Sequence, residues 1–235
     1  MKRRVLVCFF VGLFVVGLAI CGLAETVEEA FRKSFPQARF DAINPTDVKG
    51  LYEVVAGTTI AYFVPETGYL ILGEIIGRNG INLTTQRVNE IILSKAGNLP
   101  LNKAIRIGKG KHVVIEFTDP DCPYCRRMSL FFEERNDVAR YIFFFPLTIH
   151  KDAENKVKYI LCSQDRVKAY GEAMKGKLDD QKYEICNKPE VEDLIKLHKE
   201  TSVNLGINGT PFFIINNVVI SGANMPQIEE ALRQK

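Results

Sequence analysis

The 235-residue sequence contains no internal repeat, no low-complexity tract and no basic run beyond its first four positions. Its composition, 46% hydrophobic and 25% charged with 17 Gly and 10 Pro, is close to the globular average, which excludes wholesale disorder and a collagen-like fold. No acidic residue precedes Glu25, and removing residues 1–24 leaves 28 basic residues against 28 acidic residues. A neutral chain without a basic patch lacks the electrostatic footprint for nucleic acid, so no nucleic-acid partner is expected.

The N-terminal segment 1–24 has the pattern of a cleaved secretory signal peptide. Its three basic residues precede an uncharged apolar run that ends in small residues, with Gly22 and Ala24 at the −3 and −1 positions. The apolar run is about 20 residues long and could span a bilayer, so a retained anchor is an alternative, and lipid attachment at Cys21 is another. An exported chain reaches an oxidising compartment, in which disulfides persist.

Residues 25–83 predict a small α+β unit, built from one helix and an antiparallel sheet. The segment 26–35 places its apolar residues near one helical face, and Pro36 ends it. Short strand-like runs, interrupted by Gly or Pro, follow at 51–56, 58–64 and 69–76. Because about 59 residues are marginal for an independent fold, we expect this unit to act as a dimerisation domain that gains buried surface by oligomerising.

Residues 84–100 predict a helix that links two differently patterned regions. Thr84 or Thr85 can cap its start, and Gly97 with Pro100 ends it. A helix packed on only one of the two regions is the alternative.

Residues 101–235 have the element order of a thioredoxin-like fold with a helical insertion. The predicted elements, in chain order, are strand 112–119, helix 122–136, strand 139–147, a mostly helical insertion over about 152–206, a hairpin over 211–221 and a helix over 225–233. The first two strands are near-continuous apolar runs, which indicates burial on both faces of the sheet. The predicted fold class of the whole chain is α+β.

Cys122 and Cys125 form a C-x-x-C motif within FTDPDCPYCRRMSLFF. The motif follows a buried strand and opens a helix, whose free N–H groups and positive dipole end stabilise a thiolate on Cys122. Cys125 lies one turn into the helix, where it is less exposed and has a higher pKa. We therefore predict that Cys122 is the attacking thiol and Cys125 the resolving thiol. We expect a Cys122 pKa below about 7, which the charges of Asp119 and Asp121 would oppose.

Two alternatives compete with a redox role for this cysteine pair. A zinc knuckle needs further ligands, but no second C-x-x-C exists, and His112, His150 and His198 have no ligand spacing. A purely structural disulfide is the other alternative, although so short a ring constrains little of the unfolded chain. We expect no metal and no other cofactor.

Three more residues are candidates for the site or its framework. Glu116 lies six residues before Cys122, and a buried carboxyl there would have a raised pKa and could relay a proton to or from Cys125. Strand alternation equally allows an edge position that points to water. Cys162 and Cys186 lie in the predicted insertion, where they form either a disulfide worth about 3 kcal/mol or two free thiols.

The stretches FTDPDCPYC, GINGTPFFI and VKGLYEVVAGTTIAYFVPETGYLILGEII resemble the DsbC/DsbG family of periplasmic disulfide isomerases, over essentially all of residues 25–235. The resemblance implies a V-shaped homodimer joined through the N-terminal domains, with linker helices that lead to two thioredoxin-fold domains. It implies a cis Pro211 beside the C-x-x-C and a structural disulfide that joins Cys162 to Cys186. The substrate-binding residues that it implies are Thr210, Pro211, Pro123 and Tyr124.

The function implied by the resemblance is that of a periplasmic thiol–disulfide isomerase. Reduced Cys122 would attack a wrong disulfide in a misfolded exported protein, and either a substrate thiol or Cys125 would resolve the mixed disulfide. A membrane electron donor of the DsbD type would re-reduce the dithiol. A dithiol oxidase with the same chemistry, and a redox-linked holdase chaperone that binds unfolded chains in the dimer cleft, are the alternative hypotheses.

Overall fold

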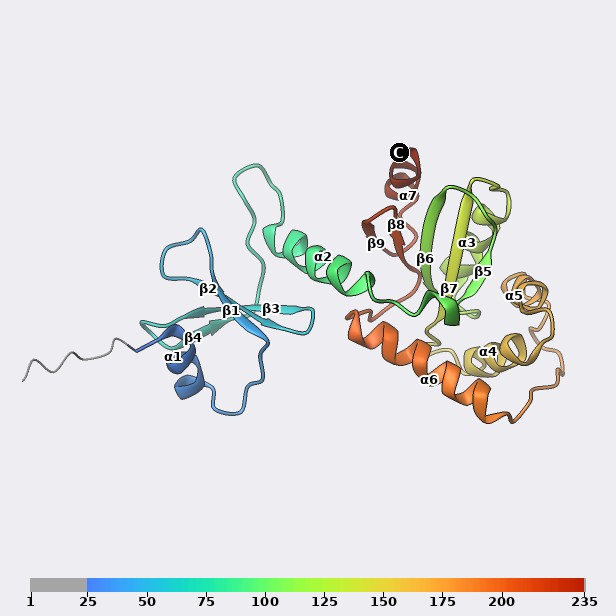
Figure 1. Ribbon diagram of the computed structural model, residues 1–235, viewed down its shortest axis with the longest axis horizontal. Helices are drawn as coiled ribbons and strands as arrows, with labels where there is room; N and C mark the ends of the chain where they lie inside the picture. Colours follow the sequence, from blue (N-terminus) through green and yellow to red (C-terminus); the bar gives the residue numbers. More distant parts are fainter. Residues whose placement is uncertain (1–24, 235) are drawn as a thin grey trace, which may run out of the picture.

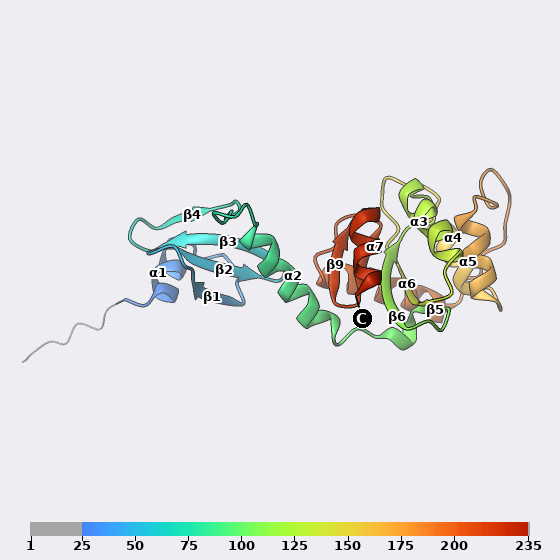
Figure 2. The ribbon, with the colours of Figure 1, turned by 90° about the horizontal axis from the view of Figure 1, so that it is seen from above.

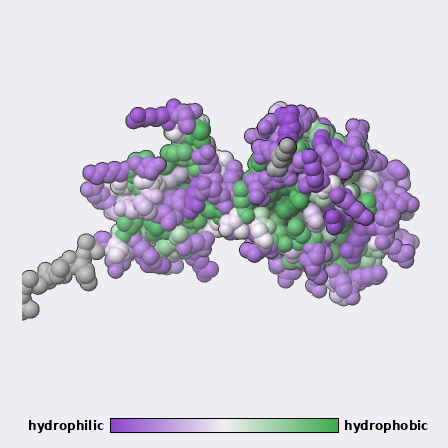
Figure 3. Space-filling model, turned by 45° about the horizontal axis from the view of Figure 1, so that its top comes forward, coloured by the Kyte–Doolittle hydropathy of each residue, from purple (hydrophilic) through white to green (hydrophobic). Residues whose placement is uncertain are grey.

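The computed structural model describes residues 25–234, which form two lobes joined by a helix (Figures 1 and 2). The predicted signal peptide, with Gly22, Ala24 and the alternative lipid site Cys21, lies outside the described residues. Within the described part of the chain, no helix has the length and apolar character that crossing a membrane requires. Hydrophobic side chains reach the surface of both lobes (Figure 3).

The N-terminal lobe is one helix on an antiparallel sheet of four strands in the order β1-β2-β3-β4. Its elements are α1 (Val27–Ser34), β1 (Ala42–Pro45), β2 (Tyr52–Ala56), β3 (Thr59–Val64) and β4 (Tyr69–Ile71). Thr26 and Glu29 form a capping box at the start of α1, and Phe31 packs edge-on against Phe63 of β3 in the core. The sequence analysis did not predict β1. The strand β4 ends at Ile71, whereas the predicted strand extends over 69–76.

The helix α2 (Leu83–Ala96) is attached to both lobes, rather than to one. At its N-terminal end, the Thr84 hydroxyl contacts the Tyr62 hydroxyl of β3 and accepts a hydrogen bond from the Ile75 backbone N–H. At its other end, Ile92 is buried in a core cluster of the C-terminal lobe, and the Lys95 ammonium donates to the Asn204 carbonyl at 3.1 Å. The helix is capped by Asn82 and not by either predicted threonine.

The C-terminal lobe is built on a five-stranded mixed sheet in the order β5-β7-β6-β8-β9. Its strands are β5 (Ile105–Ile107), β6 (His112–Thr118), β7 (Val138–Phe144), β8 (Phe212–Ile215) and β9 (Val218–Ser221), and a short 3-10 helix, η1 (Leu101–Lys103), precedes them. The central strand β6 runs parallel to β7 and antiparallel to β8. The predicted hairpin is confirmed, because Asn216 and Asn217 adopt the positive φ values that a tight turn requires.

Helices cover both faces of this sheet (Figure 2). They are α3 (Pro123–Glu133), α4 (Ala153–Cys162), α5 (Arg166–Met174), α6 (Pro189–Asn204) and α7 (Met225–Arg233). Val114 of β6 packs in one buried cluster with Met128 of α3, whereas Phe117 of β6 packs in another with Ile92 of α2. The strand preceding the C-x-x-C is therefore buried on both faces, as its apolar run predicts.

A disulfide joins Cys162, at the end of α4, to Cys186 in the segment between α5 and α6. The two cysteines are 24 residues apart in the sequence, so the bond closes a loop that contains all of α5. It ties the 175–188 segment, which has little regular structure, to a helix that packs in the core.

We expect the double substitution Cys162→Ser with Cys186→Ser to lower the free energy of unfolding by about 3 kcal/mol, because a loop of this length loses its constraint on the unfolded chain. Urea denaturation, followed by circular dichroism, measures the change. Wild-type protein with this bond reduced should show the same midpoint as the double variant. An unchanged midpoint in the double variant would contradict the prediction.

Candidate active site

Cys122 and Cys125 lie at the start of α3, immediately after the turn that leaves β6. Cys122 is the N-cap residue, Pro123 occupies the first helical position, and Cys125 lies within the first turn. Both thiols are buried and neither forms a disulfide bond, and Cys125 has no exposed surface. The two sulfurs therefore occupy different surroundings, since one lies at the open end of a helix and the other under its first turn.

The two thiols have opposite pKa shifts. A hydrogen bond from the Cys125 side chain lowers the pKa of Cys122 to about 5, and the backbone N–H groups of Cys125 and Tyr124 at the helix start add to this effect. Burial raises the pKa of Cys125, and its interaction with Cys122 raises it further. The expected order of acidities is confirmed, and the partner thiol contributes more to it than the helix N-terminus does.

The Thr210–Pro211 peptide bond is cis and lies beside Cys122, as the resemblance implies. The Cys122 Sγ atom is 3.5 Å from the Thr210 carbonyl oxygen. Among the described residues, the buried hydroxyl groups of Thr210 and Thr118 have no hydrogen-bond partner. These hydroxyl groups are the polar groups available to a thiolate on the buried sulfur.

The residues between the cysteines, Pro123 and Tyr124, are both exposed. The Tyr124 ring is 58% exposed, and the Arg127 guanidinium lies over it at 5.4 Å from the ring centroid. An exposed aromatic side chain beside a reactive thiol is suited to contact with a polypeptide.

The turn before Cys122 is held by the buried carboxylate of Asp119. This carboxylate accepts hydrogen bonds from the backbone N–H groups of Asp121 and Leu147, both at 2.7 Å, and it lies 2.8 Å from His150 Nδ1. The Asp119 carbonyl also accepts from the Cys122 N–H at 3.1 Å. The Asp119 carboxylate thus has three hydrogen-bonding or ion-pair partners. One of them is His150, which the sequence analysis did not connect with the cysteine pair.

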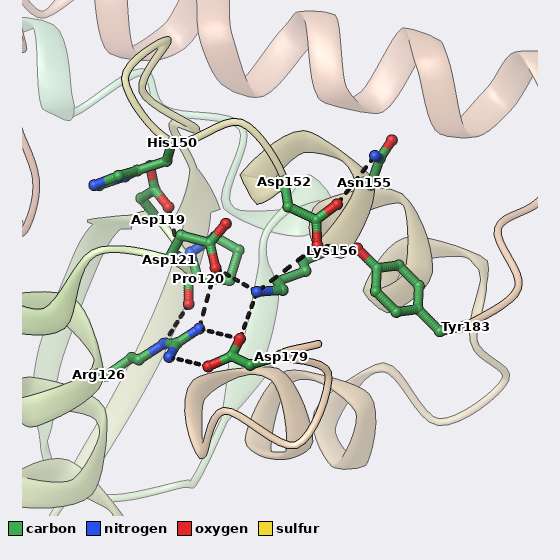
Figure 4. Close-up of polar contacts among 10 residues, drawn as sticks. All are labelled: Asp119, Pro120, Asp121, Arg126, His150, Asp152, Asn155, Lys156, Asp179 and Tyr183. Atoms are coloured by element: carbon green, nitrogen blue, oxygen red, sulfur yellow. Dashed lines mark hydrogen bonds and ion pairs between the residues drawn. The ribbon is translucent and has the colours of Figure 1, made fainter. Parts of the chain in front are cut away.

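A second charged cluster joins the active-site turn to the helical insertion (Figure 4). Arg126 donates to the Pro120 carbonyl at 2.6 Å and to both carboxylate oxygens of Asp179, at 2.6 and 2.8 Å. The buried Lys156 ammonium bridges Asp121 and Asp179. Arg126 lowers the pKa of Asp179 to about 2, with Lys156 contributing. Asp121 and Arg126 therefore pair within this cluster, and neither of them presents a free charge to Cys122.

Glu116 is fully buried, which excludes the water-facing alternative, but its carboxylate is not alone. The Arg140 guanidinium of β7 donates to Glu116 Oε2 from Nη2 at 2.7 Å and from Nε at 3.2 Å. The expectation of a buried carboxyl without a charged partner is wrong, because Arg140, which lies in a strand of apolar residues, points inward and pairs with Glu116. Alternation along β7, read from the neighbouring Ile142 and Phe144, could have found it.

Two family models match the chain. A model described as the disulfide bond isomerase protein N-terminal domain matches residues 21–85, and one described as a thioredoxin-like domain matches residues 101–232, more than half of the chain.

Curated relatives cover most of the chain at lower identity. A probable thiol:disulfide interchange protein DsbC from Bordetella avium is 28% identical over 216 residues, which is 89% of this chain and 75% of that protein. The thiol:disulfide interchange protein DsbC of Escherichia coli is 26% identical over 226 residues, 92% of this chain and 91% of that protein. A solved disulfide interchange protein from Neisseria gonorrhoeae has 35% identity and a TM-score of 0.49, covering 57% of this chain and 96% of that one.

We expect the thiolate absorbance of the reduced protein to titrate near pH 5, and to disappear from that range in Cys122→Ser. Because the folded pKa is below the ordinary value of about 8.5, this thiolate stabilises the reduced protein at high pH, and the stabilisation is lost as the pH falls towards 5. Ultraviolet absorbance against pH measures the titration. A midpoint near about 8.5 would contradict the assignment.

Asp179→Asn should lower the free energy of unfolding at neutral pH by on the order of 1 kcal/mol, since Arg126 and Lys156 lose a charged acceptor. Its depressed pKa means that the wild-type advantage is present above the ordinary value of 3.8 and is lost as the pH falls towards 2. Urea denaturation at several pH values tests this. Asp180→Asn, at the next residue and exposed, is the matched control and should be neutral; equal effects of the two would contradict the role of the cluster.

Proposed function

Because the chain belongs to the DsbC family of thioredoxin-like thiol:disulfide interchange proteins, we propose that it is an isomerase that rearranges non-native disulfides in exported proteins. The observation that carries the proposal is the difference in pKa and burial between the Cys122 and Cys125 thiols. Cys122 has a pKa of about 5, whereas Cys125 is buried with a raised pKa. A thiol that is ionised at neutral pH can attack a substrate disulfide while its neighbour stays protonated.

The proposed reaction has two steps. The Cys122 thiolate attacks one sulfur of a substrate disulfide, so that a mixed disulfide forms and the other substrate sulfur leaves as a thiolate. A different substrate thiolate then attacks the mixed disulfide, releasing Cys122 and leaving a new substrate disulfide, with no net oxidation. When Cys125 attacks instead, the substrate is reduced by two electrons and the Cys122–Cys125 disulfide forms. An electron donor of the DsbD type in the membrane would then restore the dithiol.

The surroundings of Cys122 support binding of an extended polypeptide. Thr210 and Pro211 present backbone beside the reactive sulfur, with the Thr210 carbonyl 3.5 Å away. Pro123 and Tyr124 flank it on the helix side, and the Tyr124 ring is exposed. We propose that these four residues hold the substrate chain against Cys122, and that backbone contacts make the site tolerant of sequence.

The N-terminal lobe would join two copies of the chain. The strand β4 is an edge strand that pairs only with β3 among the described strands, and apolar side chains lie exposed along and after it. These side chains are Tyr69, Ile71, Leu72 and Ile76. An open edge with an apolar surface is suited to pairing about a twofold axis, which would place two dithiols across one cleft.

The proposed location is the periplasm. Residues 1–24 would direct export and be removed, which leaves 25–83 as the dimerisation domain, 84–100 as the linker and 101–235 as the catalytic domain. The predicted cleavage after Ala24 and the disulfide between Cys162 and Cys186 support an oxidising compartment.

We expect the variant Ile71→Lys with Leu72→Lys to be monomeric and to lose most of its isomerase activity on a scrambled substrate protein, because two copies repel at the β4 edge. It should still exchange disulfides with a small dithiol at the wild-type rate. Sedimentation velocity and recovery of substrate activity measure the two properties.

Two further variants control this experiment. Val203→Lys with Val167→Lys adds the same charge at exposed aliphatic positions of the catalytic lobe and should remain dimeric and active. Cys122→Ser should be inactive in every exchange assay. A wild-type mature chain that sediments as a monomer would favour a plain oxidoreductase. A monomeric variant with full isomerase activity would contradict the proposed role of the dimer in isomerisation.

A further inference from the structure

A cavity of about 250 Å³ lies between α3 and α5, against the strands β5 and β7 of the catalytic lobe. Its wall is mostly apolar, and the side chains that form the apolar part are Ile107, Leu130, Phe132, Val138, Val167 and Met174. Within residues 25–234, the lining contains neither Cys122 nor Cys125. The cavity is therefore separate from the exchange site, and the proposed exchange reaction gives it no role.

The apolar wall is interrupted by the guanidinium of Arg140, which lines the cavity from β7 and is only 3% exposed. Its Nε and Nη2 atoms donate to Glu116 Oε2 at 3.2 and 2.7 Å, and Nη2 also donates to the Tyr170 hydroxyl oxygen at 3.0 Å. The third nitrogen, Nη1, has no hydrogen-bond partner among the described residues. It is not sealed from solvent either, because the sealed and unpaired side-chain atoms of residues 25–234 are the hydroxyls of Thr118 and Thr210. Nη1 therefore offers N–H donors to a molecule in the cavity.

The charged side chains that surround the cavity are already paired with one another. The ion pairs are Arg140–Glu116, Lys175–Glu133 and Arg135–Asp137. A charged molecule that entered the cavity would lose its hydration without meeting an unpaired opposite charge in these pairs, which is costly. An uncharged molecule with an oxygen acceptor avoids this cost, because it can still accept a hydrogen bond from Nη1.

One wall of the cavity contains a glycine that packing does not require. Gly171 lies inside the helix α5 and lines the cavity, and a Cβ atom built on it would meet no atom within 4 Å. Its backbone is helical, so a left-handed conformation does not explain the glycine either. Glycine in a helix interior is destabilising relative to alanine. The missing side chain leaves space in the wall of the cavity, and that space has a use if a ligand fills it.

The volume of the cavity limits the size of its occupant. An apolar protein cavity of about 150 Å³ holds benzene, so this cavity has room for one ring and a short substituent. It is smaller than the sites of about 300 Å³ or more that bind drug-sized molecules. Leu130 and Val167 line the cavity and are 49% and 44% exposed, so a bound molecule would cover apolar surface that now faces water.

We propose that this cavity is a second binding site, for a small uncharged molecule with an apolar body and one carbonyl or hydroxyl oxygen. The oxygen accepts a hydrogen bond from Arg140 Nη1, and the apolar body lies between α3 and α5, where it contacts Phe132 and Met174. The site does not depend on the proposed isomerase function, because the dithiol takes no part in it. Cys122→Ser should bind the molecule as the wild type does, so a failed isomerase assay leaves this proposal intact.

Two ligands of nearly equal size test the preference for an uncharged molecule. In 4′-fluoroacetophenone the ring carries a ketone, whereas in 4-fluorobenzoate a charged oxygen replaces the methyl group. Each is titrated with the wild-type mature chain and followed by fluorine NMR. We expect the ketone to bind with a Kd on the order of 1 mM, a typical affinity for about ten non-hydrogen atoms. The benzoate should bind at least about tenfold more weakly, because its charge is buried without a partner. Absence of saturable ketone binding, or equal or tighter binding of the benzoate, would overturn the proposal.

Two variants of α5 test whether the ketone binds in this cavity. Gly171→Leu places a side chain in the cavity and should weaken ketone binding at least about tenfold, while the thermal midpoint rises because leucine is the better helix former. Lys168→Leu adds the same side chain at an exposed position of the same helix and should bind the ketone as the wild type does. A raised midpoint with lost binding excludes unfolding as the cause. Wild-type affinity in Gly171→Leu, or equal losses in the two variants, would overturn the proposal, and the comparison of the two ligands needs no variant to fold.

Discussion

The unequal surroundings of the Cys122 and Cys125 sulfurs are the constraint on which the catalytic lobe depends. One sulfur accepts hydrogen bonds at the start of α3, and the other lies under the first turn without exposed surface. Such an arrangement requires a strand buried on both faces, a tight turn and a helix that begins at a fixed residue. The parallel pairing of β6 with β7 and the N-cap position of Cys122 provide these features. The sulfur chemistry is thus a result of the sheet topology.

Charged groups around the dithiol are numerous, yet each carboxylate that approaches it has a partner. Asp119 is occupied by two backbone N–H groups and His150, and Asp121 by Arg126 and Lys156. Paired charges hold the turn in place without imposing a field of one sign on Cys122. The helical insertion contributes Lys156 and Asp179 to this arrangement, so it supports the active-site turn in addition to enlarging the lobe.

Sequence patterns predicted the elements that follow from periodicity and from turn residues. The buried strands, the hairpin at Asn216 and Asn217, and the helix that begins at the C-x-x-C are confirmed. The short edge strands β1 and β5 were missed, because three or four residues give too little periodicity to recognise. The partners of Glu116 and Asp119 were missed for a different reason: Arg140 and His150 come from distant parts of the chain, and only the folded sheet brings them together.

The attachment of α2 to both lobes has a geometric consequence. Its first turn is fastened to β3, its last turn is part of the catalytic core, and Gly206 approaches the β2–β3 turn so closely that a Cβ atom there would collide with Thr58. The helix α2 therefore acts as a rigid spacer that fixes the distance between the β4 edge and Cys122. In a twofold pair, two such spacers would set one spacing between the reactive sulfurs, and that spacing would select client proteins by their diameter.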